Sequence, residues 1–282
     1  MIVEKAYAKV NLFLNVLGKR KDGYHDLEML NVKIDLHDLL EFNLIDCDNT
    51  VIIKSNDLFL SNQDNIVLQV AKHMLKNFNI NNGLEIKIEK NIPFGAGLAG
   101  NSADSAAVIK GIDKLFNLNL STKEMMDIGV IFSADIPYCL FDKPAFVSKI
   151  GEIVNDFELD LSEYKLLLIN PREFISTKDV FGFADKHHFD IKDIDKIKEF
   201  CEQNNIPAIR ENVHNSLEEI VINNYDFMRN FKDNLVAELG SEGLVMTGSG
   251  SSFIKILHKN EDVSDFISRY NEKYLIKLHN FL

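Results

Sequence analysis

The stretch IPFGAGLAGNSADSAA, residues Ile92–Ala107, decides how this sequence is interpreted. It places three glycines within six residues, directly before a short polar segment and a predicted helix. Each glycine loses much backbone entropy on folding, so a plain turn accounts for one of them better than for three. The first N–H groups of a helix carry about half a positive charge and can bind phosphate without a lysine. The stretch therefore favours an anion-binding loop over a purely structural turn.

Regular elements are predicted on both sides of this loop. Apolar residues at helical spacing predict a helix over Asn65–Phe78, and alternation with charges predicts a strand over Leu84–Ile88 that leads into the loop. A second helix is predicted over Ser102–Phe116, with Asn101 or Ser102 as its N-cap. Small residues in its first turns let the helix start lie close to a strand or a ligand.

Gly95, Gly97 and Gly100 also satisfy G-x-G-x-x-G, which by itself is a weak signal for a dinucleotide site. A dinucleotide fold needs an acidic residue ~20 positions further on, after a second strand. The residues Asn117–Leu120 at that distance include no acid, and a helix follows instead. A P-loop is also excluded, because no Gly-Lys-Ser/Thr follows and the loop contains no lysine.

The beginning of the chain is predicted to be mostly β. Residues Ile2–Val16 alternate with period two, so Lys9 and Asn11 project together from the face opposite the apolar one. A solvated lysine on a surface strand is the ordinary structural interpretation of Lys9. Further strands are predicted over Leu27–Ile34 and Leu39–Ile45.

The rest of the chain alternates helices and strands around a polar boundary near residues 155–163, which predicts two domains, 1–160 and 161–282. The predicted helices are Thr122–Ile131, Thr177–Lys186, Asp193–Gln203, His214–Leu239 and Val263–Tyr270, and the predicted strands are Tyr164–Ile169, two strands around TGSGSS within Leu244–Leu257, and Leu275–Leu278.

Composition limits the classes of partner. The 282 residues carry 31 Lys and Arg against 43 Asp and Glu, a formal charge of −12, which argues against nucleic acid and against anionic membranes. No apolar run approaches the ~18 residues of a membrane helix, and the first residues do not resemble a leader. Three widely spaced cysteines suit a reducing compartment as buried or incidental thiols. We expect a cytoplasmic protein that binds small molecules.

Three segments together resemble a known family. PFGAGLAGNSADSAA resembles the P-x-x-x-G-L-G-x-x-S-S-x-A-A signature of the GHMP kinases, named for galactokinase, homoserine kinase, mevalonate kinase and phosphomevalonate kinase. AKVNLFLNVLGKRKDGYHDLEML and MTGSGSS are similar to the first and third motifs of one branch, which DGYH and SADIP separate from its relatives. The chain departs from that branch at Ala99, Asn101, Ala103, Ser105 and Ser133.

This resemblance implies an α+β fold of two domains, with mixed, mostly antiparallel sheets each packed with helices and an active site in the cleft between the domains. It implies transfer of the γ-phosphoryl group of ATP to a hydroxyl of a cytidine diphosphate sugar alcohol, in the non-mevalonate isoprenoid route. Mg²⁺ is implied by the ATP chemistry. We expect a monomer or weak homodimer.

The resemblance also assigns roles to residues. Asp135 would accept the alcohol proton, although a carboxylate that caps the turn before Pro137 is the structural alternative, and Lys9 would favour the ionised carboxylate and offset charge on the phosphoryl group. The nucleotide would contact Asn65, Pro93, Phe94, Gly95, Ala96, Gly97, Leu98, Ala99, Gly100, Asn101, Ser102 and Ala103. The substrate would contact Asn11, Tyr24, His25 and Phe181. No residue is assigned to a metal.

Three alternatives remain open at this point. In the first, the chain would be another GHMP kinase that acts on homoserine or a mevalonate. In the second, it would be a nicotinamide-dependent oxidoreductase that uses the G-x-G-x-x-G loop. In the third, it would be a nucleotide-binding module without catalytic activity.

Overall fold

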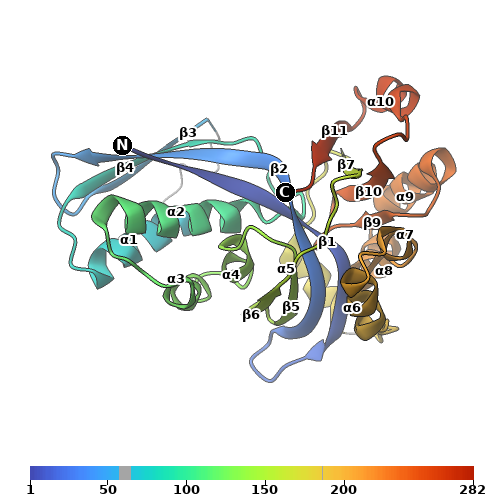
Figure 1. Ribbon diagram of the computed structural model, residues 1–282, viewed down its shortest axis with the longest axis horizontal. Helices are drawn as coiled ribbons and strands as arrows, with labels where there is room; N and C mark the ends of the chain where they lie inside the picture. Colours follow the sequence, from blue (N-terminus) through green and yellow to red (C-terminus); the bar gives the residue numbers. More distant parts are fainter. Residues whose placement is uncertain (57–64, 186) are drawn as a thin grey trace. The chain divides into compact units, whose positions relative to one another are not determined.

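The computed structural model describes residues 1–56, 65–185 and 187–282, and these form two compact units (Figure 1). The first unit consists of Met1–Ala8, Leu36–Pro93 and Ala99–Asp142, and the second of Lys9–Asp35, Phe94–Leu98 and Lys143–Leu282. The long strands β1 (Ile2–Lys19) and β2 (His25–Ile45) each contribute residues to both. The units are compact groups defined by packing, so the division into domains 1–160 and 161–282 stays a prediction.

The first unit is a sheet with helices on one face. β4 (Gly83–Glu89) pairs antiparallel with Leu39–Ile45 of β2 and parallel with β3 (Val51–Ser55). Helices α1 (Ile66–Asn77) and α2 (Gly100–Phe116) cover this sheet in Figure 1. They are followed along the chain by α3 (Thr122–Gly129) and α4 (Ile136–Cys139).

Helix α2 lies close against the sheet because small residues face it. A Cβ atom added to Gly111 would lie 2.4 Å from the ring of Phe42 on β2, so only glycine fits at this contact. On α2, Ala106, Ile109 and Ile112 are at most 1% exposed. Glycine at residue 111 thus lets this part of α2 lie directly against β2.

The second unit contains a four-stranded antiparallel sheet and an extension of the first two strands. The sheet has the order β11-β7-β10-β9, formed by Leu275–Asn280, Tyr164–Asn170, Phe253–His258 and Leu244–Met246. Residues Leu27–Asn31 of β2 pair antiparallel with β5 (Ala145–Lys149), which pairs with β6 (Ile153–Asp156), while β8 (His214–Asn215) runs parallel to β1. The helices are α5 (Thr177–Ala184), α6 (Ile194–Glu202), α7 (Ile206–Glu211), α8 (Ser216–Asn224), α9 (Asp226–Leu239) and α10 (Ser264–Tyr270).

The α+β class with mixed, mostly antiparallel sheets is confirmed, although individual elements differ from the prediction. The two strands predicted over Leu27–Ile34 and Leu39–Ile45 form one continuous strand, β2. The single helix predicted over His214–Leu239 is wrong, because Asn215 caps α8 by accepting from the Leu217 N–H and Tyr225 adopts an extended conformation between α8 and α9. The predicted end of a helix at Lys186 lies outside the described residues.

Strand β1 differs from a surface strand in its burial. Alternation predicts one buried face, but every residue from Ala8 to Val16 is buried, including Lys9 at 4% and Asn11 at 0% exposure. The solvated interpretation of Lys9 is therefore wrong.

Among the helices of the described residues, none has the length and hydropathy that crossing a bilayer requires.

Candidate active site

The glycine-rich loop is the segment with Gly95 and Gly97 that precedes α2. In the second unit, Gly97 lies against the TGSGSS segment near the end of the chain. Gly97 has φ +75°, and a Cβ atom there would lie 2.2 Å from the carbonyl oxygen of Thr247. The Thr247 hydroxyl donates to the Gly97 carbonyl at 3.2 Å, and the Lys9 N–H donates to the Leu98 carbonyl at 3.2 Å. The first and third motifs therefore hold the backbone of the loop, and packing explains the need for glycine at residue 97.

Lys9 and Asn11 project together from β1, as predicted, and their side chains meet. Asn11 Oδ1 accepts a hydrogen bond from Lys9 Nζ at 3.0 Å and another from the Gly248 N–H at 2.9 Å. Asn11 Nδ2 donates to Asn31 Oδ1 at 2.6 Å, and the Asn11 N–H donates to the Thr247 hydroxyl at 3.1 Å. Asn11 thus orients Lys9 and connects it to the third motif, while its contact with a substrate stays a prediction.

The first unit carries the helix that follows the loop. Helix α2 begins at Gly100, and its N-cap is Ala99 in the left-handed conformation, with φ 55° and ψ 32°. The predicted cap at Asn101 or Ser102 is wrong, because both residues lie inside the first turn. The methyl side chain of Ala99 cannot accept a hydrogen bond, so the N-cap residue does not cap the first N–H groups of α2. N–H groups at such a helix start can bind an anion.

Ala99 predicts a stability effect, because a residue with a Cβ atom costs ~1–2 kcal/mol in the left-handed region, where glycine costs little. We expect Ala99→Gly to raise the free energy of unfolding by ~1 kcal/mol, measured by urea denaturation. Ala103→Gly is the matched control: it removes the same methyl group from the interior of α2 and should be destabilising. A destabilised Ala99→Gly variant would contradict the assigned backbone conformation.

Two serines connect the start of α2 to Asp135. The Ser102 and Ser133 hydroxyls lie 3.0 Å apart, and Ser133 Oγ also accepts from the Asp135 N–H at 3.3 Å. The serine that replaces the family's usual glycine at 133 thus places the segment of Asp135 beside the first turn of α2. Asp135 is the N-cap residue of α4, and its side chain makes no capping hydrogen bond to that helix.

Lys9 and Asp135 belong to different compact units. The predicted pairing of their charges stays a prediction, as do the catalytic roles of both residues.

Tyr24, His25 and Phe181, which are predicted to contact the substrate, all belong to the second unit. The His25 and Phe181 rings lie 5.1 Å apart between centroids at 35°, which is direct ring contact and leaves no room for a base between them. His25 Nε2 lies 3.2 Å from Asp185 Oδ1, without hydrogen-bond geometry. Lys19 pairs with the same carboxylate and holds the pKa of Asp185 below its usual range. Tyr24, in the DGYH turn, is 59% exposed.

Asn65 has a structural role at the start of α1. Its Oδ1 accepts from the Val67 N–H at 2.8 Å, so Asn65 is the N-cap of α1. A contact with adenine stays a prediction.

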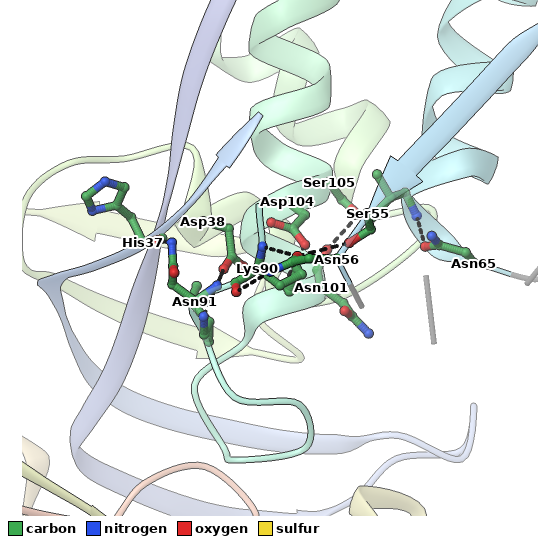
Figure 2. Close-up of polar contacts among 12 residues, drawn as sticks. His37, Asp38, Ser55, Asn56, Asn65, Lys90, Asn91, Asn101, Asp104 and Ser105 are labelled. Carbon is green, nitrogen blue, oxygen red and sulfur yellow. Dashed lines mark hydrogen bonds and ion pairs between the residues drawn. The ribbon is translucent and has the colours of Figure 1, made fainter. Parts of the chain in front are cut away.

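A buried group of charges in the first unit was not anticipated from the sequence (Figure 2). Lys90, at the end of β4, pairs with the Asp38 carboxylate from β2 and with Asp104 Oδ2 from α2, the latter at 2.7 Å. Asp38 Oδ1 also accepts the N–H groups of Asn91 at 2.5 Å and Ile92 at 2.8 Å. Burial raises the pKa of Asp104 to about 7, although Lys90 opposes this shift. We call Asp38, Lys90 and Asp104 the buried charge cluster.

The raised pKa of Asp104 predicts a dependence of stability on pH. The folded chain keeps a proton at Asp104 that the unfolded chain releases near its ordinary pKa of 3.8, so the stability from this group is full below pH ~4 and falls as the pH rises to about 7. We expect Asp104→Asn to remove this decrease in stability. The unfolding free energy of the variant minus that of the wild type should therefore increase by at least ~1 kcal/mol between pH 4 and pH 7. Chemical denaturation across this range measures the gap. A constant gap would contradict the raised pKa.

Comparison with known proteins identifies the family. Residues 65–143 match the GHMP kinases N terminal domain. A protein of Clostridium tetani named 4-diphosphocytidyl-2-C-methyl-D-erythritol kinase is 38% identical over 281 residues, which cover 97% of this chain and 98% of that protein. The chain belongs to the GHMP kinase family. Within this family it groups with the 4-diphosphocytidyl-2-C-methyl-D-erythritol kinases, since a relative of that name in Caldicellulosiruptor bescii is 36% identical over 89% of this chain and 88% of its own length.

A solved structure agrees in fold. The crystal structure of 4-(cytidine 5'-diphospho)-2C-methyl-D-erythritol kinase superposes with a TM-score of 0.79 at 23% identity and covers 99% of each chain. At that identity the likeness shows the fold alone. Membership of a kinase family removes the nicotinamide-dependent alternative and makes the chain an ATP-dependent phosphotransferase.

Several residues of this kinase were not assigned from its sequence, although the structure connects them to the predicted site. Thr247 and Gly248 lie in the recognised third motif, and Ser133 was noted only as a departure from the family pattern. Asn31 and Asp185 lie in no motif that we recognised, because their contacts join segments far apart in the sequence.

Proposed function

We propose that this chain transfers the γ-phosphoryl group of ATP to the 2-hydroxyl of 4-diphosphocytidyl-2-C-methyl-D-erythritol. The observation that carries the proposal is the near full-length relationship to a kinase of that name, at 38% identity. The buried Lys9 and Asn11, bonded to each other and to the TGSGSS segment, are compatible with it. The substrate side is supported by the aromatic contact between His25 and Phe181.

In the proposed reaction, the oxygen of the substrate 2-hydroxyl forms a bond to the γ-phosphorus, and Asp135 accepts the proton of that hydroxyl. The bond from that phosphorus to the β,γ-bridging oxygen breaks, and ADP leaves. Such transfers pass through a loose transition state, so the protein mainly positions the reactants and offsets charge. The Lys9 ammonium would offset charge on the transferred group, and the first N–H groups of α2 would bind phosphate oxygens.

Mg²⁺ belongs to the proposal as a partner of ATP, where it would neutralise part of the phosphate charge. Among the described residues, no group of three His, Cys, Asp or Glu side chains is arranged to hold a metal. We also propose a cytoplasmic monomer or weak homodimer.

The aromatic contact suggests how cytosine binds. Because His25 and Phe181 touch each other, the base would stack on an outer face of this pair, next to the exposed ring of Tyr24. Asp185 and Lys19 would hold His25 in place.

Consumption of ATP in the presence of Mg²⁺ tests the proposal, with 4-diphosphocytidyl-2-C-methyl-D-erythritol, homoserine and mevalonate as parallel acceptors. We expect turnover with the first acceptor alone. Faster turnover of mevalonate or homoserine would assign the chain to another branch of the family, and ATP binding without turnover of any acceptor would support the inactive nucleotide-binding module.

A further inference from the structure

The buried charge cluster lies at both ends of the glycine-rich loop. The side chain of Lys90 and the N–H groups of Asn91 and Ile92, just before the loop, all bond Asp38. Asp104, in the first turns of α2 just after the loop, bonds the same Lys90 Nζ at 2.7 Å. The side chains of Asp38, Lys90 and Asp104 point toward one another in Figure 2. One ammonium group therefore joins the residue that enters the loop to the helix that leaves it.

The backbone of Lys90 is fixed as well as its side chain. The Lys90 N–H donates to Asn56 Oδ1 at 2.8 Å, and Asn56 Nδ2 donates to the Lys90 carbonyl at 3.3 Å (Figure 2). Residue 90 is thus held through its main chain by Asn56, just after β3, and through its side chain by β2 and α2. A residue held at so many points transmits a fixed position to the loop that follows it.

The charges in this cluster do not suit a purely stabilising role. Both carboxylates have side chains that are 0% exposed, and they share a single ammonium group whose side chain is 7% exposed. Buried ion pairs seldom stabilise a fold more than apolar residues of the same volume do, and an excess carboxylate makes the balance worse. Asp104 Oδ1 is buried and has no hydrogen bond within the described part of the chain. The arrangement instead fixes the positions of Asp38, Lys90 and Asp104 relative to one another, because charged hydrogen bonds are short and directional.

We propose that Lys90 is a positioning residue for the nucleotide, which fixes the separation of the two ends of the glycine-rich loop through Asp38 and Asp104. The inference rests on the proposed function, since it assumes that the loop binds ATP. Lys90 touches no reacting atom in this scheme. Its loss should weaken ATP binding and leave binding of the cytidylyl alcohol unchanged.

Titration of the Lys90→Met variant with MgATP, and separately with the cytidylyl alcohol, tests the inference. We expect the Kd for ATP to rise at least ~10-fold, because small displacements of binding groups have effects of this size. The Kd for the alcohol should stay within about twofold, and Lys90→Arg, which keeps the charge, should recover part of the ATP affinity.

Lys114→Met is the matched control. Lys114 lies on α2 itself and, like Lys90, bonds a buried carboxylate, that of Glu4, at 2.7 Å, but it lies at the end of the helix away from the loop. We expect it to bind ATP as tightly as the wild type. An equal loss of ATP affinity in this variant would mean that any weakened ion pair on α2 has the effect, and would overturn the specific role of Lys90.

A variant without the ammonium group leaves two buried carboxylates together and can fail to fold. The triple variant with Lys90→Met, Asp38→Asn and Asp104→Asn removes this repulsion and keeps an oxygen at residue 38 for the Asn91 and Ile92 N–H groups. If it folds by circular dichroism and binds ATP within twofold of the wild type, the inference is overturned. If it folds and binds ATP at least ~10-fold more weakly, the inference is supported.

The wild type separates the two proposals. Wild-type chain that does not bind MgATP overturns the proposed function and this inference together. If the wild type binds MgATP and phosphorylates the cytidylyl alcohol, and a folded Lys90→Met variant binds ATP with unchanged affinity, this inference alone is overturned.

Discussion

Asp135→Asn is expected to lower kcat by at least ~100-fold, with little change in the Kd for ATP. The amide cannot accept the proton of the attacking hydroxyl, and loss of a general base commonly costs 10²–10⁴-fold. Asparagine has the same shape, and the Asp135 N–H keeps its bond to Ser133 Oγ, so the segment should stay in place. Steady-state kinetics with saturating ATP and the cytidylyl alcohol measure the change.

Asp127→Asn is the control for this variant. Asp127 lies on α3, where its exposed carboxylate bonds Lys123 at 2.9 Å, so its loss removes one negative charge from the same unit without touching the α2 start. We expect wild-type kcat. A wild-type rate in Asp135→Asn would remove Asp135 from the reaction, and equal losses in both variants would mean that net charge, and not the position of the carboxylate, sets the rate.

Lys9→Met should also lower kcat at least ~100-fold, because it removes the ammonium group proposed to offset charge on the transferred phosphoryl group. Methionine has a similar length and suits a site that is only 4% exposed, so the fold should persist. Asn11 loses one of its donors but keeps the Gly248 N–H, which holds the TGSGSS segment. Kinetics with both substrates and a thermal unfolding curve measure the two effects separately.

Lys5→Met provides the comparison on the same strand. Lys5 shares the parity of Lys9 on β1 but is exposed, and its loss should leave kcat unchanged. A rate for Lys9→Met within ~10-fold of the wild type, with the fold intact, would contradict a catalytic role for Lys9 and reduce it to a buried partner of Asn11.

Local pattern predicted most elements of this kinase, because period two and period 3.6 reflect which side chains can be buried. It failed where burial or capping was decided by distant residues. The end of α8 depends on the extended conformation of Tyr225, which follows from no periodicity across His214–Leu239. The burial of Lys9 was missed for the same reason, because an alternating strand with a polar face is also what a surface strand looks like.

The candidate site divides in the same way. Motif resemblance selected Lys9, Asn11, the glycine-rich loop and Asp135, and the structure shows how some of them are held. Asn11 Oδ1 is shared by Lys9 and Gly248, which are separated by more than two hundred residues. The link from Ser102 through Ser133 to the Asp135 segment uses a serine that the family pattern does not require.

The sequence by itself determined the family, the class of reaction and the α+β class, since motif letters and hydrophobic periods are properties of neighbouring residues. Only the tertiary structure decided that Lys90 joins Asp38 and Asp104, that Ala99 is left-handed, and that His25 contacts Phe181 and Asp185. The physical reason is distance along the chain. A buried charge is stable only beside partners that come from other elements, and the fold alone brings those elements together.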